Sequence, residues 1–235
     1  MKPMTMYLLP ETFYALRSDE SPIPEKQRVL HPKAARIFMD MQDDLVDRAA
    51  ASWDPDKPIV TLTTMTRDNA YQYYLVRKNA PRNIPTATVG KSLHAYGMAI
   101  DVNTRDTMRR INAARIDMSF EELRKYLAGY GIMGISSERW HFNIYPGKEW
   151  FTKHEAWRMR DVLYEENWTD LSDAQKEANL DKVGAEGDSL RDKARNFQQR
   201  YSESLAVDGI PGNNTMRAVY VEWAHQNFVY AQYAE

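Results

Sequence analysis

Apolar side chains recur at helical spacing in several segments of the chain. From about Pro32 to Ala51 they fall near a period of 3.6 residues, which predicts a helix with one buried face. A second helix is expected from Asp68, a residue able to cap a helix start, to about Arg77. Two further stripes lie near the carboxyl end: Leu190, Ala194, Phe197 and Tyr201, followed by Met216, Val219, Tyr220 and Trp223.

Strand patterns lie between these helices in the first two thirds of the chain. Residues 59–64 are rich in β-branched side chains, residues 97–103 are typical of a short strand, and residues 139–145 alternate. Ser119 and Glu122 form a capping box that opens a helix to about Tyr130. This order predicts an α+β fold, with a small antiparallel sheet flanked by helices and followed by a small all-α helical domain.

Turn-forming and polar segments divide the chain further. We expect residues 1–30 to be rich in turns and residues 79–91 to form a loop. Strand patterns stop after Trp150, and the segment that follows is polar and acidic. Residues 207–215 predict a turn that ends in a helix cap. The predicted domains are therefore residues 1–152 and 188–235, joined by a linker with helical segments at 153–187.

Composition and charge exclude several classes of protein. The chain has 235 residues, of which 43% are hydrophobic, and no cysteine. Disulfide scaffolds, cysteine-bound zinc and thiol nucleophiles are excluded. A net charge of −2 gives no electrostatic footprint for nucleic acid, and no run is long enough to insert into a membrane. The first residues lack a signal-peptide core, so we expect synthesis in a cytoplasm. We expect a monomer.

The chemistry concentrates in two short segments. A catalytic zinc ion takes three protein ligands and keeps one position open for water, whose pKa the metal lowers. His94, Asp101 and His141 supply such a ligand set. Glu138, three residues before His141, is placed to accept a proton from the water and pass it to a leaving amine. Arg67 offers a guanidinium fork for a substrate carboxylate or carbonyl.

Ordinary structural roles compete with each of these assignments. Asp101 could cap a strand end, Glu138 and Arg67 could be surface charges, and Ser92 could serve only as a turn hydroxyl. Gly97 and Ala99 are small, as is needed where backbone and metal crowd together. The remaining histidines, His31, His154 and His225, are expected to be structural. The aromatic residues Tyr71, Tyr74, Tyr220 and Trp223 are expected to belong to the core rather than to a ligand platform.

The pattern Ser-x-His-x-x-Gly-x-Ala-x-Asp at 92–101, followed by Glu-x-Trp-His at 138–141, resembles a family of zinc peptidases. These are the VanY-like D-Ala-D-Ala carboxypeptidases and L-alanyl-D-glutamate endopeptidases, which include many phage endolysins. The resemblance spans roughly residues 30–150. It implies that His94, Asp101 and His141 bind zinc and that Glu138 is the catalytic base. It also implies that Ser92 lies near the substrate and that Arg67 stabilises the scissile carbonyl.

The carboxyl-terminal segment resembles a small helical peptidoglycan-binding domain. The similar residues are Phe197–Arg200, the run Val207–Gly212, Thr215, and Ala218 with Val219; Pro211 stands where an aromatic residue is usual. Together the two resemblances imply a zinc metallopeptidase that cuts the stem peptide of bacterial peptidoglycan, at an L-Ala-D-Glu or a D-Ala-linked bond.

Three kinds of protein are consistent with these motifs. A wall hydrolase without a signal peptide fits a phage endolysin, stored in the host cytoplasm and acting on the cell wall after release. The second is a bacterial D,D-dipeptidase or carboxypeptidase that acts on soluble precursors. The third is a non-catalytic wall-binding or virion protein.

Overall fold

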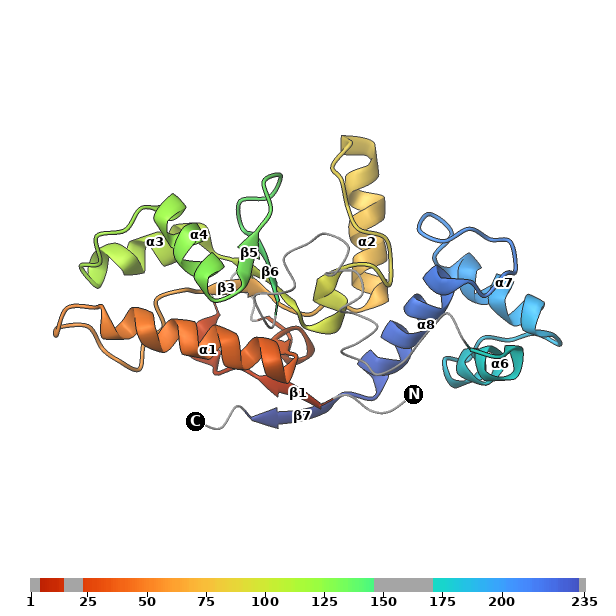
Figure 1. The fold of residues 1–235 in the computed structure, drawn as a ribbon. Coiled ribbons are helices and arrows are strands. Elements are labelled where there is room, and N and C mark those ends of the chain that lie inside the picture. Colours follow the sequence, from red (N-terminus) through yellow and green to blue (C-terminus); the bar gives the residue numbers. More distant parts are fainter. Residues whose placement is uncertain (1–4, 15–22, 146–170, 233–235) are drawn as a thin grey trace. The chain divides into compact units, whose positions relative to one another are not determined.

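A computed structural model describes residues 5–14, 23–145 and 171–232 (Figure 1). It is a mixed α/β structure with small antiparallel sheets, in agreement with the predicted α+β class. Contacts group the described residues into two units: residues 5–14, 23–66, 96–145 and 230–232 form one, and residues 67–95 and 171–229 form the other. The predicted boundary at residue 152 lies outside the described residues.

The first unit contains a four-stranded antiparallel sheet in the order β3-β4-β6-β5. Its strands are β3 (Leu62–Thr64), β4 (Ala99–Val102), β5 (Ile132–Gly134) and β6 (His141–Ile144). Three of them lie in segments where the sequence predicts a strand, and β5 is a strand that the sequence analysis missed. The central strand β4 is buried along its whole length, so both of its faces are covered.

Helices of the first unit begin where their capping residues predict. The helix α1 (Pro32–Asp47) begins at the predicted residue and ends four residues before Ala51. The helix α4 (Phe120–Gly129) opens on the predicted capping box, in which Ser119 and Glu122 satisfy each other's backbone amides. The helix α3 (Thr104–Ala113) was not predicted, and its cap is Asn103, whose side chain accepts from the Asp106 amide.

A second, three-stranded sheet corrects the prediction for the amino-terminal segment. Its strands are β1 (Thr5–Leu8), β2 (Val29–Leu30) and β7 (Val229–Gln232), in the order β2-β1-β7. Residues 1–30 were expected to be rich in turns, with no strand predicted among them, and strand patterns stop after Trp150 in the sequence. Such short strands carry almost no local pattern, because their hydrogen bonds come from segments far away in the sequence.

The second unit contains α2 (Asn69–Asn79), α6 (Asp173–Lys182), α7 (Leu190–Arg200) and α8 (Asn213–Gln226). Both predicted stripes supply its core: Ala194, Phe197, Met216 and Val219 are fully buried. The helix α6 falls within the predicted linker, of which residues 153–170 lie outside the described part. The helix α8 begins directly after its cap Gly212, whereas the sequence predicted a turn that extends to residue 215.

The α2 helix corrects the expectation for the tyrosine stripe. Its buried residues are polar, Asn69 and Gln72. The Asn69 amide donates to the carbonyl of Ala218 on α8 at 2.6 Å, and the Gln72 amide donates to the carbonyl of Ala87 at 2.6 Å. Tyr74 is 52% exposed and is not a core residue. This helix therefore contacts its own unit through hydrogen bonds to backbone carbonyls and through the ring of Tyr73, which meets Tyr201, rather than through a buried stripe that includes Tyr74.

None of the helices in the described ranges combines the length and the apolar character that a bilayer crossing requires.

Candidate metal centre

Sheet register brings Asp101 and His141 together. Asp101 on β4 is the direct antiparallel partner of His141 on β6. Directly opposed residues of an antiparallel pair project from the same face of the sheet. Accordingly, Nδ1 of His141 lies 3.0 Å from Oδ1 of Asp101. The Asp101 side chain is only 6% exposed and that of His141 only 12% exposed, so water screens this contact poorly.

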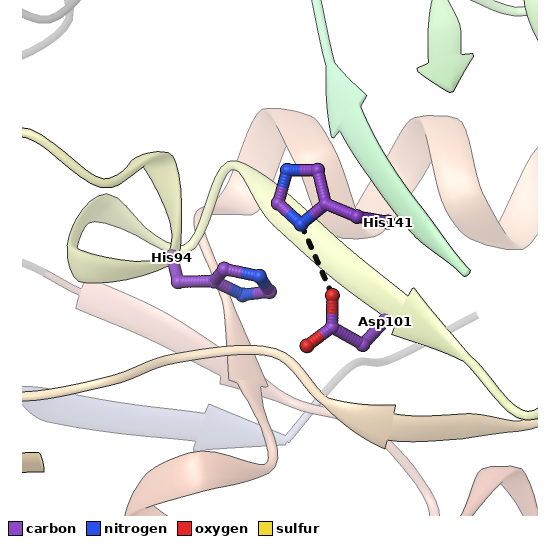
Figure 2. Close-up of side chains that lie close together, drawn as sticks. All are labelled: His94, Asp101 and His141. Atoms are coloured by element: carbon purple, nitrogen blue, oxygen red, sulfur yellow. Dashed lines mark hydrogen bonds and ion pairs between the residues drawn. The ribbon is translucent and has the colours of Figure 1, made fainter. Parts of the chain in front are cut away.

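His94 completes the cluster from a short 3-10 helix, η4 (Leu93–Tyr96), which precedes β4. Its side chain is fully buried. One potential ligand atom from each of His94, Asp101 and His141 lies within 4.8 Å of the other two. Figure 2 shows the two imidazole rings and the carboxylate directed toward one another. The three residues that the sequence singled out as metal ligands are therefore neighbours in space.

The donor atoms fit a metal ion. Two imidazole nitrogens and one carboxylate oxygen are a ligand set that divalent transition metals accept. Burying a carboxylate costs free energy unless a cation or hydrogen bonds compensate for the lost water. A cation held among His94, Asp101 and His141 would provide that compensation. The cluster is thus compatible with a metal site, and its geometry leaves the identity of the metal open.

Asn143 holds the other side of the His141 ring, a contact that the sequence analysis missed. Its Oδ1 lies 2.9 Å from Nε2 of His141. If Nε2 donates to this amide oxygen, a neutral imidazole directs its Nδ1 lone pair toward Asp101. Two acceptor atoms 3.0 Å apart repel each other unless a proton or a metal ion interacts with both. Residues two apart on a strand share a face, which is the signal that could have identified Asn143.

Glu138 lies beside His141 because the chain turns before β6. The backbone amide of His141 donates to the carbonyl of Glu138 at 3.1 Å, which closes a turn over 138–141. The Oε2 atom of Glu138 then lies 4.0 Å from Nδ1 of His141. Its side chain is 31% exposed and so is accessible to water. The structure places this carboxylate next to the ligand cluster, as the predicted base requires.

Arg67 and Ser92 lie near His94 along the backbone. The amide of Arg67 donates to the carbonyl of His94 at 3.2 Å, which connects the segment after β3 to η4. Ser92 is buried, and its carbonyl accepts from the amide of Ala95 at 3.0 Å in the first turn of η4. These contacts place both residues next to a ligand. The roles expected for the guanidinium and the hydroxyl remain predictions.

A small residue is needed at position 97 because of a close backbone contact, whereas the sequence suggested crowding by a metal ion. It adopts φ +63°, a left-handed conformation that glycine tolerates best. A Cβ atom there would lie 2.6 Å from the backbone nitrogen of His31, which itself donates to the carbonyl of Gly97 at 3.0 Å. The small residue is needed for this backbone approach.

The other described histidines make local contacts. His31 caps α1 through Nδ1, which accepts from the amide of Lys33 at 3.3 Å. Nε2 of His225 lies 3.0 Å from the carbonyl oxygen of Ala95, and its ring lies against Phe228. His154 lies outside the described residues.

Comparison with known proteins adds no further assignment, because no family model, no curated protein and no solved structure matches this chain.

Proposed function

We propose that this protein is a zinc-dependent peptidase that hydrolyses the stem peptide of bacterial peptidoglycan, in the manner of a phage endolysin. The observation that carries the proposal is the buried cluster of His94, Asp101 and His141 with the Glu138 carboxylate beside it. The sequence motifs at 92–101 and 138–141 resemble those of VanY-like peptidases, in which the same residue types bind zinc. A structural metal site would not need an accessible carboxylate next to its ligands.

Each residue has a distinct task in the proposed reaction. His94, Asp101 and His141 would hold the zinc ion, which when bound supplies a Lewis acid and lowers the pKa of a water at its open position. Glu138 accepts the proton from the attacking water and delivers it to the nitrogen of the leaving amine. Arg67 stabilises the negative charge that develops on the scissile carbonyl oxygen. Ser92 contacts the substrate backbone near His94.

Mass spectrometry of digested peptidoglycan tests the proposal. The full chain is loaded with zinc and incubated with purified peptidoglycan, with and without a chelator. We expect new amino termini within the stem peptide that disappear when the metal is removed, and their position names the bond. Release of free D-alanine without loss of cross-links would instead indicate a carboxypeptidase or dipeptidase. Absence of new termini from folded, zinc-loaded protein would overturn the proposal.

A pair of variants separates metal binding from proton transfer. Glu138→Gln removes the base and leaves the three ligands, so it should retain zinc while its rate of hydrolysis falls by about 100-fold or more. Asp101→Ala removes a ligand and should lose both zinc and activity. Glu186→Gln changes an exposed carboxylate outside the site and serves as the control. Full activity of Glu138→Gln would contradict the assigned base.

A further inference from the structure

The α2 helix has its polarity reversed. Its buried positions are the polar residues Asn69 and Gln72, whereas Tyr74 is 52% exposed. A helix at the surface of a globular unit normally buries its apolar stripe and exposes its polar one. The exposed Tyr74 stacks on the half-buried Tyr71, and Tyr73 is half-buried as well. An aromatic surface of this kind is typical of ligand-binding sites.

A cavity of about 650 Å³ lies against this exposed face. We call it the α2 groove, and its lining residues are Ala70, Tyr73, Tyr74, Arg77, Lys78 and Glu203. All of them belong to the second unit. The volume falls in the range of small-molecule and oligomer subsites.

The aromatic rings of the α2 groove are held in place by their neighbours. Tyr74 stacks on Tyr71, with 6.0 Å between ring centroids and 21° between ring planes. Tyr73 meets the ring of Tyr201 edge-on at 5.6 Å, and its hydroxyl lies 3.4 Å from Oγ of Ser202. Rings that are already ordered lose little conformational entropy when a ligand stacks on them.

Two cations, Arg77 and Lys78, line the α2 groove together with these rings. The Nζ atom of Lys78 lies 5.6 Å from the centroid of the Tyr74 ring. Nε of Arg77 lies 3.2 Å from Oε1 of Glu203, and both side chains are largely exposed. An exposed ion pair is weak, so a carboxylate of a ligand can replace Glu203 as the partner of Arg77. Residues 67–95 contain five basic and one acidic side chain, in a chain with a net charge of −2. The lining of the α2 groove thus combines two tyrosine rings with two cations and one carboxylate.

We propose that the α2 groove binds a carbohydrate chain that carries carboxylates, namely the glycan strand of peptidoglycan with its attached stem peptides. This inference rests on the proposed function. Tyr74 offers a flat apolar surface against which the C–H face of a sugar ring can stack. Arg77 and Lys78 offer charge-assisted hydrogen bonds to the carboxylates of the peptide. The α2 groove would then retain the enzyme on the polymer while its metal centre cuts the peptide.

Sedimentation with purified peptidoglycan tests the α2 groove. The full chain carries Glu138→Gln, so that the polymer stays intact during the assay. Adding Tyr74→Ala and Lys78→Ala should weaken binding by about tenfold or more, and added salt should weaken the binding of the parent. The control pair is Arg82→Ala with Ile84→Ala, which removes one exposed cation and one exposed apolar side chain outside the α2 groove. It should bind like the parent.

Three outcomes would overturn the proposal for the α2 groove. The first is that the parent does not sediment with peptidoglycan, and the second is that the groove pair and the control pair bind equally well. The third is that a single-stranded DNA oligonucleotide competes for the protein as well as soluble peptidoglycan fragments do, which would show binding to any polyanion. Hydrolysis of a soluble stem peptide by chains with Glu138 intact separates this proposal from the proposed function. The groove pair should cleave that short peptide at the wild-type rate, since cleavage of a single free peptide requires only the metal centre and no attachment to the polymer. If no variant cleaves either the soluble peptide or the polymer, the proposed function is wrong. The sedimentation result would still show whether the α2 groove binds peptidoglycan.

Discussion

Nε2 of His141 lies 2.9 Å from Oδ1 of Asn143, two residues further along β6. Asn143 thus contacts one ring nitrogen of His141 while the other, Nδ1, faces Asp101. A partner that orients a metal-binding histidine contributes to metal affinity without touching the metal. Asn143 is therefore a positioning residue of the candidate centre.

Replacing Asn143 should weaken zinc binding. Asn143→Leu removes the acceptor at nearly constant volume, and we expect about 10- to 100-fold lower affinity, measured by competition with a chromophoric chelator. Asn143→Asp keeps an acceptor oxygen and should retain most of the affinity. Asn112→Leu, on the exposed face of α3, is the control. An unchanged zinc affinity in Asn143→Leu would show that the contact is only structural.

His31 should make stability depend on pH. Burial, followed by the nearby charge of Lys33, lowers the pKa of His31 from 6.5 to about 4. Between these values the unfolded chain binds the proton and the folded chain does not, so stability falls as pH drops from about 6.5 to about 4. The loss is about 3 kcal/mol at most.

The variant His31→Asn isolates that contribution. Asparagine is a favourable helix cap, so α1 keeps its capping acceptor while the titrating group is removed. Denaturant unfolding at a series of pH values should give a flatter profile for the variant than for the parent below pH 6.5. Identical slopes for the two proteins would exclude His31 as the source.

Gly97→Ala should destabilise the first unit. The left-handed φ of +63° and the approach of a Cβ atom to the His31 nitrogen both oppose the substitution. We expect a loss of at least about 2 kcal/mol in the free energy of unfolding. Gly129→Ala is the matched control, because nothing lies within 4 Å of its Cβ position. A loss no larger than that of the control would contradict this account of Gly97.

Gln198 should stabilise the turn between α7 and α8. Its Nε2 donates to Oδ1 of Asp208 at 3.0 Å and to Oγ1 of Thr215 at 3.0 Å, and its Oε1 accepts from the amide of Gly209 at 2.8 Å. Gln198→Leu leaves the buried Gly209 amide and the buried Thr215 hydroxyl without this partner, at a cost of about 2–4 kcal/mol. Gln199→Leu, on the exposed face, should change stability by about 0.5 kcal/mol or less. Equal unfolding midpoints for the two variants would exclude the network.

The sequence alone predicted features that depend on neighbouring residues. A helix cap requires only a side chain and an amide three residues away, which is why Asp68 and the Ser119–Glu122 box were identified correctly. Apolar stripes likewise identified the buried faces of α7 and α8. The candidate ligands His94, Asp101 and His141 were chosen by residue type and spacing, and the structure brings them together.

Features that depend on distant partners were decided only by the tertiary structure. The strands β1 and β7 lie in one sheet although more than 200 residues separate them, so neither has a local pattern. Asn69 is buried because its amide reaches the carbonyl of Ala218, and that contact reverses the expected face of α2. Asp101 lies opposite His141 through the register of β4 and β6. Hydrogen bonds between separate segments form only when the chain has folded, so the local periodicity of the sequence does not predict them.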